Sequence, residues 1–96
     1  MLVNRRTYVV KMGCMEEAVA NVVAATESES FPHNTRRIYA SSISPFVTVV
    51  LEVEYENLAE YEKGWTGFVA SQAAAAKEKW VSLLEGGTNE IWTLVE

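Results

Sequence analysis

The strongest constraint in this sequence is a ten-residue stretch, residues 47–56, in which two kinds of side chain alternate. Successive side chains of a β-strand point to opposite faces, so an alternation with a period of two predicts a strand with one apolar and one polar face. The apolar face would carry Val47, Val49, Leu51, Val53 and Tyr55, and the other face Thr48, Val50, Glu52, Glu54 and Glu56. We expect the first face in the core, and what covers the three glutamates becomes the main question about the molecule.

The rest of the chain predicts alternating strands and helices. The predicted elements are a strand at residues 2–10, a helix at 15–28, strands at 35–43 and 47–56, a helix at 57–84 and a strand at 89–95. The link at residues 44–46 is short, so the second and third strands should form an antiparallel hairpin. This β-α-β-β-α-β order in a single domain, residues 1–96, predicts an α+β fold. It is the ferredoxin-like plait, a four-stranded antiparallel sheet with both helices on one face.

Cap and breaker residues predict where the second helix begins, bends and ends. Asn57 is a favourable N-cap residue, and Glu60 three positions later completes a capping-box pattern. Gly64 and Gly67 weaken the helix, so a bend or break is expected between Gly64 and Ser71. The pair at residues 86–87, both glycine, predicts the stop at the C-terminal end.

The first strand is ambiguous. Arg6, Tyr8 and Val10 would share one face, and Arg5, Thr7 and Val9 the other. Neither set is cleanly apolar, so periodicity does not decide which face meets the helices.

The charge balance disfavours a nucleic-acid partner. The 96 residues carry a net charge of -5, and basic residues adjoin only at Arg5-Arg6 and Arg36-Arg37. A phosphate backbone requires clustered Lys and Arg, so nucleic-acid binding is not expected. No apolar run is long enough for a signal peptide or for the roughly 20 residues of a membrane span, so we expect a cytoplasmic protein without a membrane partner.

Metal and thiol chemistry have little support in the sequence. His33 is the only histidine and Cys14 the only cysteine, and neither has the neighbouring ligands that a metal or haem site requires. We therefore predict no metal and no cofactor. Trp65, Phe68 and Trp80 recur at helical spacing and are expected to pack in the core rather than to line a pocket.

Several segments resemble the NIPSNAP family of the dimeric α/β-barrel superfamily. They are Arg6-Thr7-Tyr8-Val9-Val10-Lys11-x-Gly13, Arg37-Ile38-Tyr39, Glu52-Val53-Glu54-Tyr55, Leu58-Ala59-Glu60-Tyr61-Glu62 and Glu90-Ile91-Trp92. Met12 departs from the pattern, in which proline is expected before the glycine. The resemblance implies that two copies of the chain join through the sheet faces without helices and enclose a barrel. It implies no settled activity, because the superfamily includes cofactor-free monooxygenases, isomerases, haem-dependent peroxidases and regulatory ligand-binding modules.

In such a barrel the polar face of residues 47–56 would point inward. Buried carboxylates are costly unless they are paired, and arginines on neighbouring strands could hold them. One interpretation is a structural network of ion pairs; the other is a polar ligand site. The candidate residues for that site are Arg6, Tyr8, Arg37, Tyr39, Glu52, Glu54 and Trp92.

Three functions remain open at this point. The first is a homodimeric barrel that binds a small organic molecule, in the barrel or between sheet and helices. The second is a cofactor-free monooxygenase or isomerase, with Glu52 or Glu54 as the base and Tyr8, Tyr39 or Trp92 shaping the site. The third is a non-catalytic dimerisation or interaction module whose own side chains fill the barrel. A cavity of several hundred Å³ would favour binding, and a filled interior would favour the module.

Overall fold

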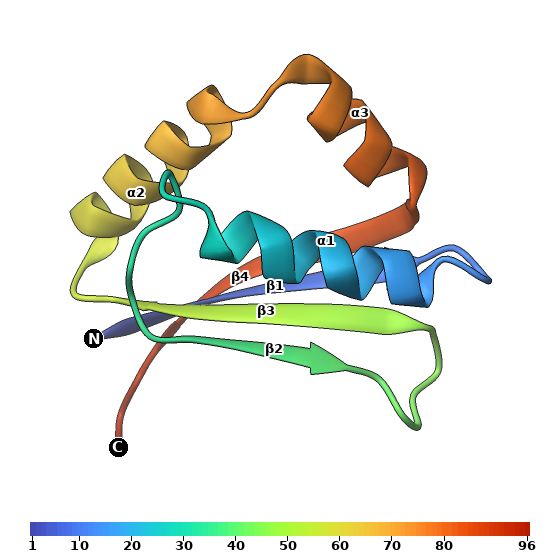
Figure 1. Cartoon of the computed structure of the whole chain (residues 1–96). Helices are drawn as coiled ribbons and strands as arrows, with labels where there is room; N and C mark the ends of the chain where they lie inside the picture. The colour runs from blue at the N-terminus through green and yellow to red at the C-terminus, as the bar shows by residue number, and fades with distance from the viewer.

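A four-stranded antiparallel sheet in the order β2-β3-β1-β4 forms one layer of the computed structural model, which describes residues 1–96. Three helices form the second layer, on one face of the sheet (Figure 1). The elements are β1 (Leu2–Val10), α1 (Met15–Glu27), β2 (Arg36–Ala40), β3 (Thr48–Tyr55), α2 (Leu58–Ser71), α3 (Ala74–Ser82) and β4 (Leu84–Thr93). The predicted ferredoxin-like plait is confirmed.

The core lies between β3 and the helices. Val49, Leu51, Val53 and Tyr55 are all buried, as the alternation along residues 47–56 predicted. Val47, predicted on the same face, is 41% exposed because it lies in the connection before β3. Phe31, Val22 and Phe68 are among the residues that pack against them from the helical layer. On the other face Val50 is buried, whereas the side chains of Thr48, Glu52, Glu54 and Glu56 remain at least partly accessible to solvent. The period of two therefore identified the core face of the central strand correctly.

The helical segment predicted at residues 57–84 contains a break, as the two glycines suggested, but at a slightly later position. The helical segment is divided, because Gln72 and Ala73 have extended backbones between α2 and α3. The break lies just beyond the predicted interval from Gly64 to Ser71. A straight helix of that length would extend about 42 Å at 1.5 Å per residue, whereas the longest extent of the molecule is 36 Å. Dividing the helix lets both pieces lie over the sheet (Figure 1).

Two further boundaries differ from the prediction. Gly86 and Gly87 do not stop a helix: α3 ends at Ser82 and β4 begins at Leu84, so both glycines belong to β4. Gly87 is paired with Tyr8, and a Cβ at Gly87 would lie 2.5 Å from the carbonyl oxygen of Thr7. The glycine thus permits a close approach of two strands. The second strand is also shorter than predicted, since β2 ends at Ala40 and residues 41–47 form the connection to β3.

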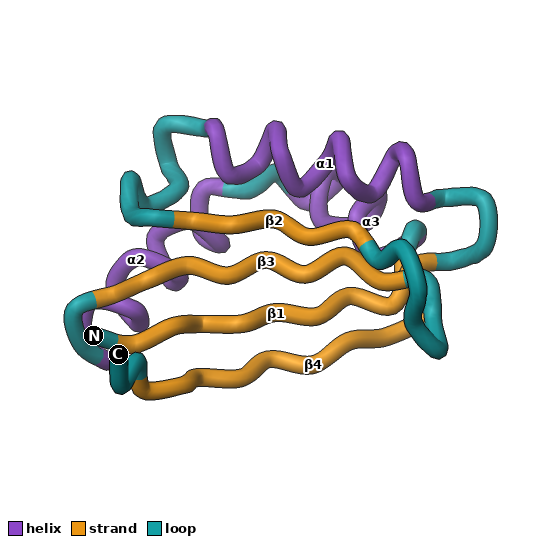
Figure 2. Tube along the Cα trace, turned by 90° about the horizontal axis from the view of Figure 1, so that it is seen from below, coloured by secondary structure: helices purple, strands orange, loops and turns teal.

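The face of the sheet opposite the helices carries no covering element. Figure 2 shows all four strands from this side with the helices behind them. We call it the open face. None of the three helices is both long and apolar enough to cross a membrane.

Candidate functional site

The pairing of β1 with β3 shows which side chains of β1 lie on the same face of the sheet as Glu52 and Glu54. Arg5 is the direct partner of Glu52, and Val3 is the partner of Glu54, so these side chains share the open face. Arg6 is paired with Leu51 and Tyr8 with Val49, which are core residues. Arg6 and Tyr8 therefore lie on the helix side of the sheet. A site on the open face, the face that a barrel would enclose, cannot include these two candidates, and Arg5, which was not a candidate, lies there instead.

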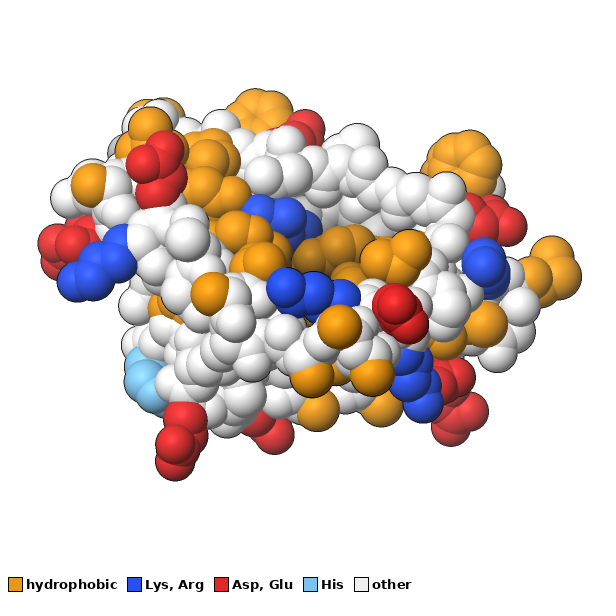
Figure 3. All heavy atoms as spheres, turned by 90° about the horizontal axis from the view of Figure 1, so that it is seen from above, with side chains coloured by type: hydrophobic (Ala, Val, Ile, Leu, Met, Phe, Trp, Pro, Cys, Tyr) orange, Lys and Arg blue, Asp and Glu red, His pale blue; other side chains and the backbone are white.

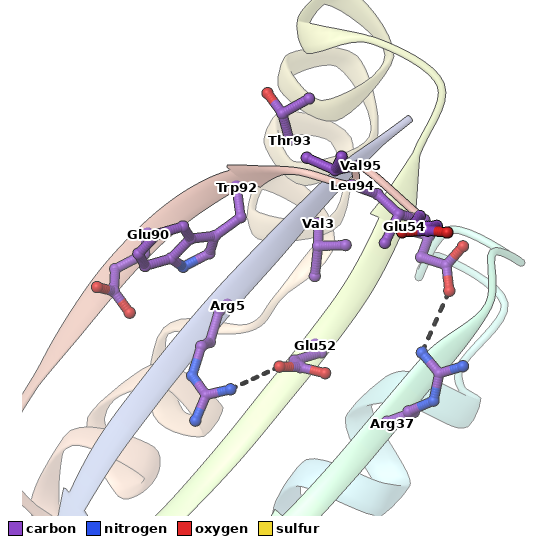
Figure 4. Close-up of a pocket in the computed structure, with 11 residues that line it drawn as sticks. Val3, Arg5, Arg37, Glu52, Glu54, Glu90, Trp92, Thr93, Leu94 and Val95 are labelled. Atoms are coloured by element: carbon purple, nitrogen blue, oxygen red, sulfur yellow. Dashed lines mark hydrogen bonds and ion pairs between the residues drawn. The ribbon is translucent and has the colours of Figure 1, made fainter.

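The open face brings the other five sequence candidates together. Nη1 of Arg5 lies 2.6 Å from Oε2 of Glu52, and Nη1 of Arg37 lies 3.2 Å from Oε2 of Glu54 (Figure 4). The hydroxyl of Tyr39 donates a hydrogen bond of 3.2 Å to the other oxygen of Glu52. The expectation that arginines on neighbouring strands hold both glutamates is confirmed.

A hollow of about 720 Å³, open to solvent, lies over these ion pairs. Figure 4 shows the side chains of Arg5, Glu52 and Trp92 on adjacent strands around it. Trp92 is 56% exposed and Tyr39 is 45% exposed, both high values for aromatic side chains. The hollow is lined by Val3, Arg5, Arg37, Glu52, Glu54, Glu90, Trp92, Thr93, Leu94, Val95 and Glu96.

A second cavity lies on the other side of the sheet, between β1, β3 and the three helices. Its volume is about 310 Å³, and hydrophobic residues make up 11 of the 15 that line it. They are Tyr8, Asn21, Val22, Ala24, Ala25, Thr26, Phe31, Leu51, Trp65, Phe68, Val69, Gln72, Ala76, Lys77 and Trp80. Figure 3, seen from the helix side, shows a hollow between the helices with hydrophobic side chains inside it and Lys or Arg side chains beside it. We call this space the helix-side cavity.

Aromatic pairs stiffen the walls of the helix-side cavity. The rings of Tyr8 and Trp80 meet edge to face with centroids 4.9 Å apart, and those of Phe31 and Phe68 do the same at 4.9 Å. The sequence predicted that Trp65, Phe68 and Trp80 pack in the core. They do contact the core, but they also line the cavity. Their helical spacing places them on one side of a continuous helix. The break between α2 and α3, just beyond the interval in which the sequence predicted it, separates Trp65 from Trp80 around the space.

Arg6 adjoins this cavity. Its guanidinium carbon lies 3.6 Å from the ring centroid of Trp65, in cation–π geometry. Nη2 donates to the hydroxyl of Tyr61 at 2.9 Å, and Nε donates to Oδ1 of Asn4 at 3.2 Å. Asn4 is itself buried and donates to Oδ1 of Asn89. The guanidinium therefore contacts the neutral groups of Asn4, Tyr61 and Trp65.

Two tyrosine hydroxyls on this side of the sheet have perturbed acidities. Burial raises the pKa of Tyr8, an effect that the nearby positive charge of Arg6 partly offsets. Burial also raises the pKa of Tyr55 to about 12, with a further contribution from Tyr61. The Tyr55 hydroxyl has no hydrogen-bond partner. Both phenols are neutral at physiological pH.

The only histidine and the only cysteine lie apart from both hollows. His33 belongs to the loop between α1 and β2, and Cys14 precedes α1 as a free thiol of intermediate exposure. No three His, Cys, Asp or Glu side chains are grouped in a way that could hold a metal ion.

Comparison with known proteins gives matches in structure alone: no protein-family model and no curated protein matches the chain. An uncharacterized NIPSNAP domain protein from Burkholderia xenovorans has a TM-score of 0.82 at 18% identity, over 99% of this chain and 95% of the other. A dimeric ferredoxin-like protein from an uncultured marine organism has a TM-score of 0.80 at 13% identity, over 99% and 88%. A candidate antibiotic biosynthesis monooxygenase from Nitrosomonas europaea has a TM-score of 0.76 at 18% identity, over the full length of both chains.

These likenesses establish a fold rather than an activity, because all three identities are below 20%. The fold agrees with the resemblance of the sequence segments to the NIPSNAP family. The chain is a ferredoxin-like protein with the fold of the NIPSNAP proteins.

Proposed function

We propose that this protein is a homodimeric α/β barrel whose protomers each bind a small, largely apolar organic molecule in the helix-side cavity. The observation that carries the proposal is the cavity itself: about 310 Å³, walled mostly by hydrophobic and aromatic side chains, with a few polar groups. Small-molecule sites in proteins have this size and this composition. The open-face hollow is larger but is more open and more polar.

Binding is better supported than acid–base catalysis. Asp, Glu and His are absent from the residues that line the helix-side cavity. Glu52 and Glu54, the candidate bases for an isomerase or monooxygenase, lie on the opposite face and are held by arginines. Each carboxylate is thus already engaged in an ion pair, on the face of the sheet away from the cavity.

The second copy of the chain is proposed to cover the open face. Trp92 and Tyr39 are exposed there, and an uncovered face of this kind is uncommon in a monomer. One protein of the same fold is described as dimeric. Pairing two open faces would also remove Glu52 and Glu54 from bulk water. Away from water a carboxylate needs a charged partner, and Arg5 and Arg37 supply one to each.

The second candidate binding site is the interior of the barrel. The hollow of about 720 Å³ over Arg5, Glu52 and Trp92 supports it. The three tryptophans discriminate between the two sites. Trp65 and Trp80 line the helix-side cavity, whereas Trp92 lines the open-face hollow. Their indole N–H signals in a ¹H–¹⁵N NMR spectrum, assigned with single Trp→Phe variants, therefore report which space is occupied.

The test is a titration with naphthalene-2-carboxamide, a neutral planar probe. We expect the signals of Trp65 and Trp80 to shift while that of Trp92 stays in place. Ala76→Phe should block the effect because Ala76 lines the cavity, and Ala75→Phe, on the same helix but outside the lining, should preserve it. A shift confined to Trp92 would favour the barrel interior, and the absence of any shift would favour a non-catalytic module.

A further inference from the structure

Arg6 is the one arginine of the four in this chain that has no carboxylate partner. Arg5, Arg36 and Arg37 each form an ion pair with a glutamate. The chain has 13 acidic residues against 8 basic ones, so acidic partners are not scarce. Arg6 is nevertheless surrounded by the neutral groups of Asn4, Tyr61 and Trp65. A partly buried cation without a counter-ion is costly to the folded protein and suggests that the counter-ion comes from outside.

The guanidinium keeps free donors for such a counter-ion. Arginine has five N–H groups, and the bonds to Asn4 and Tyr61 use Nε and one hydrogen of Nη2. The contact with Trp65 uses the flat face of the guanidinium and none of its hydrogens. A hydrogen bond to the hydroxyl of Tyr8 engages at most one more, so at least two of the five N–H groups remain for a carboxylate.

The position of Arg6 connects it to the helix-side cavity. Trp65, on which it stacks, lines the cavity, and so does Tyr8, two residues along β1 on the same face of the sheet. Tyr8 is close enough for the charge of Arg6 and a hydrogen bond with it to act on the hydroxyl, which adds a second donor beside the guanidinium. Arg6 thus stands at the border of the cavity, between two of the side chains that form its wall.

A second cation lies on the opposite wall. Lys77 on α3 lines the cavity, is exposed to solvent and forms no ion pair. No Asp or Glu lines the cavity, so the only charged side chain among its lining residues is a cation, although the protein has a net charge of -5. Apolar walls strengthen the attraction of such charges for an anion, because they exclude water from around them.

We propose that the natural ligand of the helix-side cavity is a small aromatic carboxylate, whose ring lies against Trp65, Phe68 and Trp80 and whose carboxylate accepts hydrogen bonds from Arg6. The proposal rests on the proposed function, since it names the class of molecule that the same cavity binds. Lys77 contributes long-range attraction at the mouth, and Arg6 contributes the directed contact.

The experiment compares two probes of the same shape by isothermal titration calorimetry: naphthalene-2-carboxylate and naphthalene-2-carboxamide. A charge-assisted hydrogen bond contributes about 1.5–3 kcal/mol, so the carboxylate should bind at least about tenfold more tightly. Arg6→Gln should remove this preference, and Arg6→Lys should keep part of it because the charge remains without the fork. Arg36→Gln, at an arginine that pairs with Glu27 and does not line the cavity, should leave the preference unchanged.

The outcomes separate the two proposals. If both probes shift Trp65 and Trp80 with equal affinity, or if Arg6→Gln retains the preference for the carboxylate, the anion proposal is overturned while the cavity remains a binding site. If neither probe binds, binding of planar aromatic molecules fails and the anion proposal fails with it. The comparison of probes on the unaltered protein decides the preference even if the Arg6 variants do not fold.

Discussion

Arg5 on β1 and Glu52 on β3 are direct register partners, and their side chains meet at 2.6 Å between Nη1 and Oε2. Tyr39 donates to the other carboxylate oxygen from β2, so Glu52 links three strands of the sheet. The glutamate side chain is only 17% exposed although no helix covers this face. Its two donors and the neighbouring strands thus hold it in one position.

This arrangement predicts that Glu52→Gln destabilises the protein more than Glu56→Gln. The first change weakens two hydrogen bonds to a carboxylate and should cost about 1–2 kcal/mol. Glu56 is exposed at the end of β3, and its change should remain within about 0.5 kcal/mol. Urea denaturation midpoints measure both. Equally small effects would show that the Arg5–Glu52 pair adds little to stability.

The proposed dimer predicts a mass of about twice the 10.7 kDa of the chain in light scattering after size exclusion. Trp92→Glu should reduce this to the mass of one chain, because it adds a carboxylate to a face that already carries Glu52, Glu54 and Glu90. Leu58→Glu is the control, since Leu58 is similarly exposed, at 51%, but lies on α2. A monomeric unaltered protein would contradict the barrel.

Gly86 and Gly87 are adjacent in β4 but should respond differently to alanine. A Cβ at Gly87 would lie 2.5 Å from the Thr7 carbonyl oxygen, whereas a Cβ at Gly86 would meet nothing within 4 Å. Gly87→Ala should therefore destabilise the protein by about 1–3 kcal/mol through overpacking. Gly86→Ala should be neutral or stabilise by up to about 1 kcal/mol, because it restricts the unfolded chain. Thermal unfolding of the two variants side by side provides the comparison, and equal effects would argue against the close approach of β1 and β4.

Asn57 caps α2, since its Oδ1 accepts a hydrogen bond of 2.9 Å from the backbone N–H of Glu60. Asn57→Ala should cost about 1 kcal/mol of unfolding free energy. Asn34→Ala, in an exposed loop, serves as the control and should change stability by less than about 0.5 kcal/mol. Chemical denaturation followed by circular dichroism gives both values. No difference between them would mean that α2 does not depend on this cap.

The raised pKa of Tyr55 predicts a loss of stability at alkaline pH. Its pKa is raised from 10.0 to about 12 in the folded protein, so between these values the folded state holds a proton that the unfolded state has released. The stabilising contribution is complete below about pH 10 and is lost as the pH rises toward about 12. Tyr55→Phe should reduce this loss and should not destabilise the protein at pH 7, because the hydroxyl has no hydrogen-bond partner. Unfolding midpoints against pH, with tyrosinate absorbance as a second signal, test it; identical profiles for both proteins would contradict the shifted pKa.

The alternation along residues 47–56 was enough to predict the core face of the central strand and the side on which the glutamates lie. Strand periodicity is a local property, and here one set of side chains is entirely apolar. The order of strands and helices was likewise predicted, because helical and strand patterns differ in period and each strand has its own apolar residues. The cap at Asn57 was predicted for the same reason: it depends on residues only three positions apart.

Only the tertiary structure decided which arginine faces the glutamates. Arg5 and Arg6 are adjacent on a strand without a clean apolar face, so a register one residue different would exchange them. That register depends on partners 47 positions away in the sequence, such as Glu52 for Arg5. The same holds for Gly87, whose role follows from its neighbour on β1 rather than from the residues beside it.

The helix-side cavity, too, was decided by the tertiary structure. Sequence spacing places Trp65, Phe68 and Trp80 on one side of a continuous helix, and this spacing predicts that they pack in the core. The extended backbone at Gln72 and Ala73 changes the direction of the chain, so α2 and α3 enclose a space with α1 instead of filling it. Local patterns determine which face of an element is buried, but the volume left between elements depends on how they cross, and that is a property of the packed molecule.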